Sequence, residues 1–325
     1  MSYSEPVRTA ARHSRPTVYR VRRRRGMLLG AALVVLGLVV AALAAAGHPA
    51  KDERRVPPAE HGAYVSAISW PQQGQAALVL GNGRPAASPN EQPAPIASVA
   101  KVMTAYLTLE RYPLNGEQEG FTITVTPAEA QAAAHDAATA QSFLAVRAGE
   151  QLTERQLLEA LLIPSGNNIA PMLAALVAGS ETSFLAEMNA AARALGMGHT
   201  VYTDPSGLDP STVSTAADQL RVLQQAMRFA AFRQIVSMAR VTLPVAGTVK
   251  NFNPLIDQGY AGKTGSDSAA GGCLAFFTHV TVGGRLVTAV GVVMGQGEGS
   301  ETSAILAAAG EAAKQLVDSG RSGVS

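Results

Sequence analysis

The sequence predicts an α+β domain that follows a membrane-spanning segment. Strand-like patterns lie at both ends of the region from residue 63 to 320, and helical patterns fill its middle. Because strands are stable only when they pair, the two ends are expected to meet in one antiparallel sheet of about five strands. We expect helices to flank this sheet and a mostly helical insertion to separate its first and last strands.

The N-terminal part predicts export and anchoring. Residues 1–25 form a basic tail with eight arginines and one glutamate, and residues 26–47 are uncharged and almost wholly apolar. Such a stretch is long enough to span a bilayer as a helix, and the positive-inside rule places the tail in the cytoplasm. We therefore expect a single-pass signal anchor in the cell membrane, with the domain on the extracytoplasmic side. A cleaved signal peptide stays open as the alternative. Residues 48–62 are expected to be a linker.

Within the domain, residues 64–70 and 75–80 alternate as strands and predict a β-hairpin. A proline-rich loop leads to a helix expected over Ser98–Arg111, where Val99, Val102 and Tyr106 recur at helical spacing. The later expected elements are a strand at 121–126, helices at 127–135, 153–162 with Thr153 as N-cap, 168–178, 181–195 and 215–230, strands at 259–266, 272–282 and 285–295 with a turn at Gly283-Gly284, a helix at 300–318 and a tail at 321–325.

Composition excludes several classes of function. After the basic tail, the chain carries 18 basic and 23 acidic side chains, so the folded part lacks the positive charge that nucleic-acid binding requires. The single cysteine, Cys273, cannot form an intrachain disulfide. The six histidines are scattered without paired ligand spacing, so we expect no bound metal and no cofactor.

The first candidate site is Ser98-Val99-Ala100-Lys101, at the start of an expected helix. Side chains three residues apart share a helix face, so the Lys101 amine can reach the Ser98 hydroxyl. A neutral lysine in a desolvated site can take the hydroxyl proton and make the serine a nucleophile, and a free N–H of the first helical turn can bind an oxyanion. Taken alone, Ser-x-x-Lys arises easily by chance in a chain this rich in serine and alanine.

Two further candidates follow along the chain. In the first, Ser165 and Asn167 flank a glycine after a helix, where a hydroxyl could relay a proton and a carboxamide could hold a substrate amide, although Ser-Gly-Asn is also ordinary turn chemistry. In the second, Lys263 and Thr264 lie in a strand between glycines, followed by Gly265 and Ser266. A lysine and a hydroxyl there could hold a carboxylate, and glycine in a strand suggests that another segment approaches closely. The alternative is a solvated lysine on an edge strand.

The ordered trio of motifs resembles the penicillin-recognising serine acyltransferases, which include penicillin-binding proteins and serine β-lactamases. The flanking residues make it most similar to the low-molecular-mass D-alanyl-D-alanine carboxypeptidase family, over roughly residues 63 to 320. The segments that carry this resemblance are Ile-Ala-Ser-Val-Ala-Lys-Val-Met-Thr-Ala-Tyr (96–106), Leu-Leu-Ile-Pro-Ser-Gly-Asn-Asn (161–168), Asp-Pro-Ser-Gly-Leu-Asp (204–209), Ser-Thr-Ala-Ala-Asp (214–218) and Gly-Lys-Thr-Gly-Ser (262–266).

The resemblance implies a β-lactamase/transpeptidase-like fold and a serine D,D-peptidase mechanism. Ser98 would attack the carbonyl between two terminal D-alanines of a peptidoglycan stem peptide, with Lys101 as base and Ser165 relaying the proton to the leaving amine. Asn167 would hold the substrate backbone. Lys263 and Thr264 would bind the terminal carboxylate, and the N–H groups of Ser98 and Ser266 would form the oxyanion hole. β-Lactam antibiotics would acylate Ser98.

The sequence departs from the family pattern in places, and two alternatives follow. Asn168 stands where the family commonly has aspartate, and the usual C-terminal β-rich domain is not seen in the 62 residues after Lys263. A catalytically weak wall-binding module is therefore one alternative. A serine β-lactamase is the other, but residues 200–210 contain no glutamate of the kind that the commonest class uses for deacylation.

Overall fold

The computed structural model describes residues 68–138, 141–297, 299 and 301–323, all within one compact unit that spans residues 60–325. The expected basic tail, signal anchor and linker lie outside the described residues. Among the residues that are described, no single helix is long and apolar enough to cross a membrane; only the bent pair Ile169–Ala178 and Glu181–Ala194 passes by length and composition.

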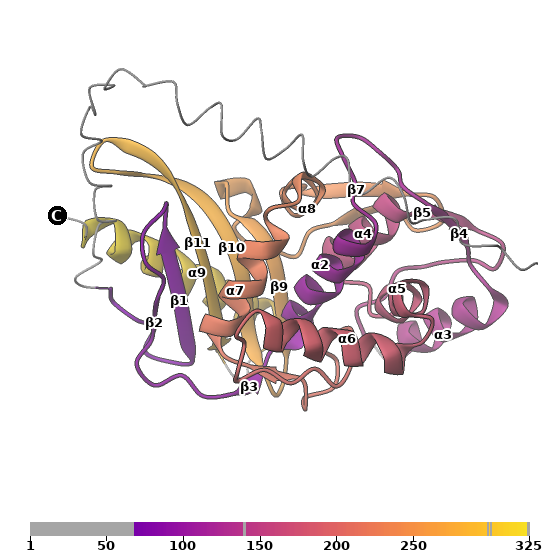
Figure 1. The fold of residues 1–325 in the computed structure, drawn as a ribbon, viewed down its shortest axis with the longest axis horizontal. Coiled ribbons are helices and arrows are strands. Elements are labelled where there is room, and N and C mark those ends of the chain that lie inside the picture. The colour runs from indigo at the N-terminus through magenta and orange to yellow at the C-terminus, as the bar shows by residue number, and fades with distance from the viewer. Residues whose placement is uncertain (1–67, 139–140, 298, 300, 324–325) are drawn as a thin grey trace, which may run out of the picture. The chain divides into compact units, whose positions relative to one another are not determined.

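A five-stranded antiparallel sheet with the order β2-β1-β11-β10-β9 organises the domain (Figure 1). Its strands are β1 (Gln75–Leu80), β2 (Ala86–Ala87), β9 (Ala261–Asp267), β10 (Gly271–Val282) and β11 (Arg285–Gln296). β1 pairs along its whole length with β11, from Gln75 opposite Met294 to Leu80 opposite Ala289. The prediction that the two ends of the domain meet in one antiparallel sheet is therefore confirmed.

The predicted β-hairpin between residues 64–70 and 75–80 is wrong in its described part. Residues 68–70 form no strand, and the edge partner of β1 is the returning chain at β2. The Ser88 hydroxyl secures this return, because it accepts a hydrogen bond from the Ala76 N–H at 3.0 Å and donates one to the Ala76 carbonyl at 3.2 Å. Alternation along a segment indicates a strand, but it does not say which segment the strand will pair with.

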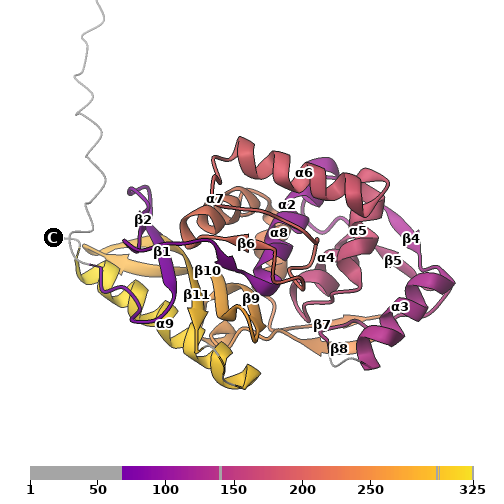
Figure 2. The same ribbon diagram turned by 90° about the horizontal axis from the view of Figure 1, so that it is seen from below.

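Both faces of the sheet are buried, and the alternation of side chains along β1 divides them. Ala76, Leu78 and Leu80 pack in a cluster with α9 (Thr302–Ser322), whereas Ala77 and Val79 belong to the larger core of the helical region. Figure 2 shows α9 on one face of the sheet and α7 (Ala216–Ala226) with α2 (Lys101–Arg111) on the other. The sheet is therefore the central layer of three.

The helical region lies between β1 and β9 in sequence. Besides α2 and α7, its elements are β3 (Ala94–Pro95), β4 (Thr122–Thr124), α3 (Pro127–Ala138), β5 (Gln151–Thr153), α4 (Glu154–Leu162), α5 (Ile169–Ala178), α6 (Glu181–Ala194), β6 (Val213–Ser214), α8 (Ala230–Val236), β7 (Arg240–Leu243) and β8 (Gly247–Lys250). Thr153 caps α4 as predicted, because its hydroxyl accepts from the Gln156 N–H while the Gln156 side chain accepts from the Thr153 N–H.

Two parts of this region differ from the expectation. The helix expected over 215–230 ends at Ala226, and Phe229, with an extended ψ of 122°, separates it from α8. The β7-β8 hairpin that follows was not expected from the sequence. The buried side chains of α8, Phe232 and Ile235, explain the break, because a straight continuation of α7 would not direct them into the same core.

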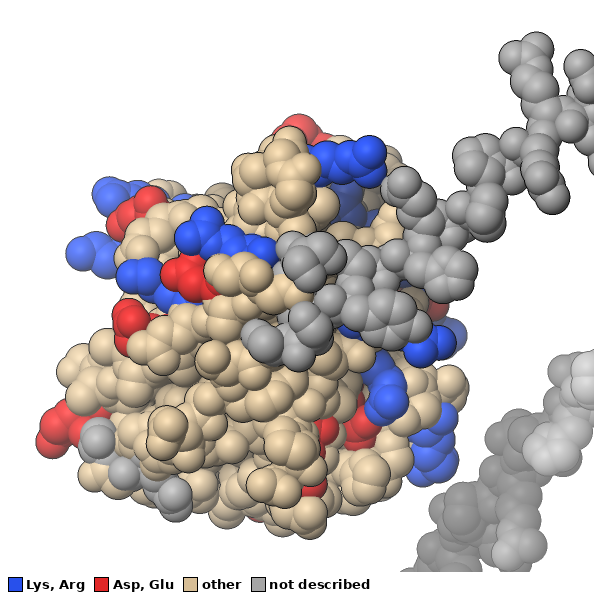
Figure 3. Space-filling view, turned by 90° about the vertical axis from the view of Figure 1, so that its left-hand side faces the viewer, with Lys and Arg blue, Asp and Glu red and all other residues tan. Residues whose placement is uncertain are grey.

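Exposed ion pairs contribute little to the stability of this domain. On the face seen in Figure 3, basic and acidic residues are interspersed and much of the surface is uncharged. The ion pairs of the described residues join positions three apart on one helix, as in Lys314 with Glu311. The two exposed pairs, Lys314 with Glu311 and Arg321 with Asp318, add about 1 kcal/mol at most each, whereas the Asp218 carboxylate that pairs with Arg221 is buried.

Candidate active site

Ser98 lies in a turn of 3-10 helix, Ala97–Ala100, that leads directly into α2. The predicted helix therefore exists, but its regular α-helical part starts at Lys101 rather than at Ser98. Ala97 has a φ of 44°, a left-handed value that is costly for a residue with a side chain. Such strained backbone conformations persist only where the surrounding structure enforces them, and they are common beside functional groups, here the adjacent Ser98.

The Lys101 amine is completely buried beneath Ser98. It contacts three oxygen atoms, Ser98 Oγ at 2.7 Å, Asn167 Oδ1 at 2.7 Å and the Ser206 carbonyl at 2.9 Å. Burial lowers the pKa of Lys101 from 10.5 to about 7, although the nearby Asp204 carboxylate opposes the shift. A large fraction of Lys101 is therefore neutral near neutral pH, and the neutral amine can accept the proton of the Ser98 hydroxyl.

The Ser206 carbonyl is a part of this arrangement that the sequence did not predict. A second contact holds the same loop against α2, because the Thr104 hydroxyl donates to the Pro205 carbonyl at 2.6 Å. Within the loop, Asp204 Oδ2 accepts from the N–H of Ser206 at 3.1 Å and from that of Leu208 at 2.9 Å. The Asp-Pro-Ser-Gly segment was noted only for its resemblance to the family, because a contact through a backbone carbonyl leaves no mark in residue type.

Gly207 allows this loop to lie against the turn that carries Ser98. Its φ is +77°, and a Cβ atom at this position would lie 1.8 Å from the Ala97 carbonyl oxygen. Both the conformation and the close approach therefore require glycine.

Ser165 and Asn167 follow α4 in a tight turn. Ser165 has a φ of 63° and is buried, and its Oγ has no hydrogen-bond partner among the described residues. A buried hydroxyl without a hydrogen-bond partner destabilises a fold by about 1–3 kcal/mol, so its presence indicates a functional role for Ser165. Asn167 accepts from Lys101 through Oδ1, and its Nδ2 is 3.4 Å from Gln141 Oε1.

Asn168 stands where the family that the sequence resembles commonly has aspartate, and its side chain holds a neighbouring segment of the backbone. Its Oδ1 accepts from the Leu144 N–H at 2.8 Å, and its Nδ2 donates to the Leu144 carbonyl at 3.1 Å. The Asn167 N–H also donates to the Ser142 carbonyl at 2.8 Å. The two asparagines therefore hold the segment at 142–144 in place, and an ionised carboxylate at 168 could not make the second of the two bonds to Leu144.

The β9 strand forms the opposite wall. Thr264, Gly265 and Ser266 line a pocket of about 90 Å³ together with Ser98 and Ser165. A Cβ atom on Gly265 would lie 2.8 Å from the Ile96 carbonyl oxygen and 3.1 Å from the Ser98 nitrogen. The close approach that the glycines in this strand indicated is therefore made by the turn that carries Ser98.

Lys263 does not line this pocket. Its side chain is buried, and its amine donates to the Thr264 carbonyl at 2.8 Å. Burial lowers the pKa of Lys263 well below its ordinary value, and the charge of Lys101 adds to this effect. An anion bound beside Lys263 would favour its protonated form, so binding of a carboxylate there would be coupled to uptake of a proton.

The structure thus brings together the Ser98 hydroxyl, the buried Lys101 amine with its lowered pKa, the unpaired hydroxyl of Ser165 and the edge strand β9. This set is suited to acyl transfer through a serine ester, because it contains a nucleophile, its base and a second group able to move a proton. Within the part of the chain that is described, no group of three or more His, Cys, Asp or Glu residues could hold a metal ion.

Comparison with known proteins places this chain among serine peptidases of one family, in agreement with the chemistry of the site. Residues 85–297 match the family described as D-alanyl-D-alanine carboxypeptidase, peptidase family S11. A D-alanyl-D-alanine carboxypeptidase of Mycobacterium tuberculosis is 34% identical over 185 residues, which cover 54% of this chain and 59% of the relative. A D-alanyl-D-alanine endopeptidase of Pseudomonas aeruginosa is 32% identical over 196 residues, which cover 57% and 60%. This chain therefore spans about 60% of the length of these curated relatives.

The fold is also similar to solved structures. The crystal structure of a Streptomyces DD-transpeptidase superimposes with a TM-score of 0.66 at 26% identity, and the match covers 78% of this chain and all of the other. The α+β architecture is therefore that of the transpeptidase-like fold.

Proposed function

The chain belongs to the D-alanyl-D-alanine carboxypeptidase family, peptidase family S11, and from this membership we propose that it is a serine-type D-Ala-D-Ala carboxypeptidase. Its substrate is a peptidoglycan stem peptide, and β-lactams acylate its Ser98. One observation carries the proposal: the buried Lys101 amine, with a pKa lowered to about 7, lies 2.7 Å from Ser98 Oγ. A nucleophile and a base matched to neutral pH are what acyl transfer requires.

In the acylation step, Ser98 Oγ forms a bond to the carbonyl carbon between the two D-alanines, and its proton moves to neutral Lys101. The carbonyl oxygen becomes an oxyanion that the N–H groups of Ser98 and Ser266 stabilise. The carbon–nitrogen bond then breaks as the leaving amine takes up the proton that Lys101 had accepted, passed on through the unpaired hydroxyl of Ser165, and Lys101 is neutral again. Free D-alanine departs and an ester to Ser98 remains.

Water completes the reaction by attacking the ester carbon. Lys101 accepts the proton of the water and returns it to Ser98 Oγ as the ester bond breaks, so the enzyme is regenerated and one water molecule is consumed for each D-alanine released. The chemistry requires no metal ion.

Three residues position the substrate. Asn167, already held through Oδ1 by Lys101, has an N–H available for the amide carbonyl that precedes the scissile bond. Thr264 binds the terminal carboxylate, and Lys263, buried behind it with its amine on the Thr264 carbonyl, stabilises the bound anion through its charge, so the lowered pKa of Lys263 rises when the anion arrives.

The location follows from the N-terminal sequence. Residues 26–47 form a membrane-spanning anchor, residues 48–62 form the linker and residues 63–320 form the peptidase domain on the cell-wall side. The support is the uncharged apolar run and the eight arginines that precede it.

The test is release of free D-alanine from an acetylated peptide that ends in D-Ala-D-Ala. The full chain in detergent is expected to release one D-alanine per peptide, whereas the same peptide ending in L-Ala-L-Ala should stay intact. Ser98→Ala should release none. Release by Ser98→Ala at the wild-type rate, or no release by a folded wild-type protein, would contradict the proposal.

A further inference from the structure

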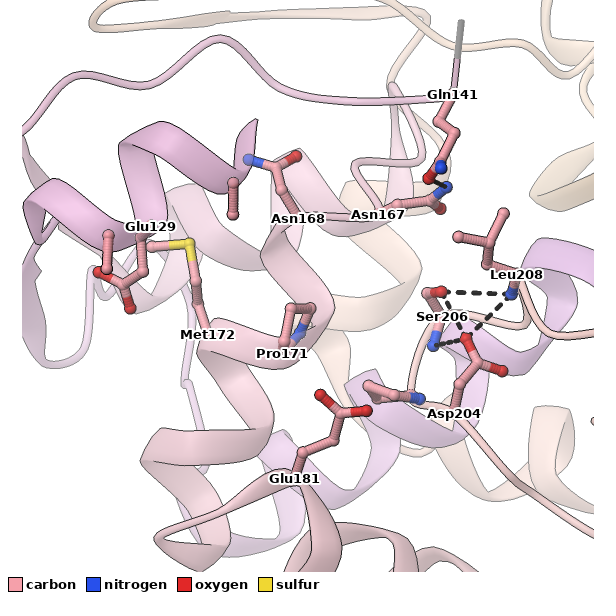
Figure 4. Close-up of a pocket in the computed structure, with 13 residues that line it drawn as sticks. Glu129, Gln141, Asn167, Asn168, Pro171, Met172, Glu181, Asp204, Ser206 and Leu208 are labelled. Carbon is pink, nitrogen blue, oxygen red and sulfur yellow. Dashed lines mark hydrogen bonds between the residues drawn. The ribbon is translucent and has the colours of Figure 1, made fainter. Parts of the chain in front are cut away.

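A pocket of about 530 Å³ opens at a distance from Ser98. Its wall is formed by residues 111–114, residues 118–121 and Glu154. It shares no residue with the small pocket that Ser98 lines, or with the pocket beside Asn167 that Figure 4 shows. We call it the distal pocket.

Two helices separate the distal pocket from the candidate site. α2 begins at Lys101, beneath Ser98, and ends at Arg111 in the wall of the distal pocket. α4 begins at Glu154 in the same wall and ends three residues before Ser165. Figure 1 shows α2 running from β9 toward the β4-β5 pair. Helices of these lengths span about 13–16 Å, so the distal pocket is not an extension of the candidate site.

Glu154 marks the distal pocket as a binding site, because its carboxylate is buried and has an unused acceptor atom. The residue is 1% exposed, and its Oε1 has no hydrogen-bond partner among the described residues. Burial raises the pKa of Glu154 to about 7. Native folds leave few buried polar atoms unpaired, so this oxygen is expected to have a partner when a ligand is bound.

The neighbouring cation Arg155 does not provide that partner. It is buried, and its guanidinium donates to the carbonyls of Gly116 and Gln118. It therefore holds the loop that leads into the pocket wall. In that wall Gly120 has a φ of +73°, and a Cβ atom there would lie 2.2 Å from Glu154 Oε2. Only glycine at position 120 leaves the carboxylate in this place.

The rest of the wall suits a positive charge that carries an apolar group. The rings of Tyr112 and Phe121 pack edge to face with their centroids 5.0 Å apart, and both line the pocket beside Pro113 and Leu114. Aromatic faces attract ammonium groups, and apolar surface favours an apolar side chain. Glu119 adds a second carboxylate to the wall.

Arg111 determines which further charge the ligand carries. It is exposed in the wall of the pocket, and its guanidinium has no hydrogen bond or ion pair within the part of the chain that is described. A guanidinium repels a second positive charge, whereas it binds a carboxylate through two N–H groups. The charges of the wall are therefore complementary to a zwitterion.

We propose that the distal pocket binds a free amino acid with an apolar side chain, its ammonium group on Glu154 and its carboxylate on Arg111. The apolar side chain lies on Tyr112 and Phe121. This inference does not depend on the proposed function, because none of these residues takes part in the acyl transfer.

The experiment is a ligand-observed nuclear magnetic resonance titration of the full chain in detergent at pH 8, with leucine and two analogues. Isoamylamine lacks the carboxylate of leucine, and 4-methylpentanoate lacks its amino group. Leucine is expected to bind with a dissociation constant on the order of 1 mM or below. Each analogue is expected to bind about tenfold more weakly, because it loses one charge contact.

Matched variants assign the binding to the distal pocket. Glu154→Gln should weaken leucine binding about tenfold and no longer distinguish leucine from 4-methylpentanoate. Arg111→Gln should no longer distinguish leucine from isoamylamine, and because Arg111 is exposed it tests the proposal even if Glu154→Gln does not fold. Glu110→Gln is the control, since Glu110 is exposed on α2 and does not line the pocket.

The affinity for leucine should also depend on pH. The ammonium binds the ionised form of Glu154, which makes up about one tenth at pH 6 and about nine tenths at pH 8, so binding should strengthen about tenfold between them. The other charged groups near Glu154 are Arg155 and Glu159 on α4, Glu119 in the preceding loop and Arg111 on α2. Burial raises the pKa of Glu159 to about 7 as well, but Glu159 does not line the pocket. Glu159→Gln should therefore keep the pH dependence, and Glu154→Gln should remove it.

Three results would overturn the proposal: 4-methylpentanoate binding as tightly as leucine, leucine binding unchanged in a folded Glu154→Gln, or no binding of leucine at millimolar concentration. Prior acylation of Ser98 by benzylpenicillin should leave leucine binding unchanged. Loss of binding in the acylated protein would place the ligand in the candidate site and overturn the proposal. If benzylpenicillin forms no adduct, the proposed function fails, and the titrations of the variants still decide whether the distal pocket binds leucine.

Discussion

In the proposed mechanism, the protonation state of Lys101 sets the pH dependence of acylation. The amine acts as a base only when it is neutral, and burial lowers its pKa to about 7. About one tenth of the enzyme then carries a neutral Lys101 at pH 6, half at pH 7 and about nine tenths at pH 8. The acylation rate constant is therefore expected to rise about tenfold from pH 6 to pH 8, to fall about tenfold per pH unit below pH 6, and to level off above pH 8.

The assay is stopped-flow acylation by a chromogenic β-lactam from pH 5 to 9, with circular dichroism at each pH to show that the fold persists. A lysine that kept its ordinary pKa would give a rate that still rises tenfold per unit at pH 9. That result, or a rate that does not change from pH 5 to 9 in the folded protein, would refute the assignment of Lys101 as the base. Lys101→Ala should slow acylation about 10²–10⁴-fold at pH 8 and remove the midpoint near pH 7.

Three other residues give further predictions. Ser165→Ala should reduce the rate of D-alanine release by about 10²-fold while the melting temperature stays equal or rises, because the hydroxyl that is removed is buried and unpaired; a stability loss with unchanged turnover would contradict the role as a proton relay. Gly207→Ala should destabilise the domain by about 1–3 kcal/mol and slow acylation, because a Cβ there would lie 1.8 Å from the Ala97 carbonyl oxygen. If the variant unfolds at the same denaturant concentration as the wild type, the loop can move away from Ala97 without cost and the prediction is wrong. Burial raises the pKa of Glu154 from 4.5 to about 7 in the folded protein. As pH rises from about 4.5 through 7, Glu154 therefore loses its proton more readily in the unfolded chain than in the folded protein, and the free energy of unfolding falls. Glu154→Gln should therefore flatten the fall in melting temperature between pH 5 and 8, and an equal fall in both proteins would place the pH dependence elsewhere.

Local signals in the sequence predicted most elements of the fold. The Thr153 cap and the strands at 259–266, 272–282 and 285–295 depend on neighbouring residues alone, and the structure has all of them within a few residues. The pairing of β1 was not predictable in the same way. Segment 64–70 alternates like a strand, but the edge beside β1 is filled by β2, which is only two residues long. The choice of partner depends on where the loop returns, and a two-residue strand carries no periodic signal.

In the candidate site, too, the features that residue type reveals were predicted and those that depend on the arrangement of the backbone were not. Ser98, Lys101 and Asn167 were identified because their side chains carry chemistry that is visible as residue type, and the structure joins them through the Lys101 amine. The Ser206 carbonyl, the third atom that holds this amine, is a backbone group and could not be recognised from any residue type.

The measurement that tests the central claim most directly is intact-protein mass spectrometry of the full chain after incubation with benzylpenicillin, followed by peptide mapping of any adduct. We expect a single stable addition of the whole penicillin molecule, located on Ser98, in the wild type, and none in a folded Ser98→Ala variant. An adduct on another residue, an adduct that persists in Ser98→Ala, or a folded wild type that is never acylated would contradict the claim that Ser98 and Lys101 form the nucleophilic centre.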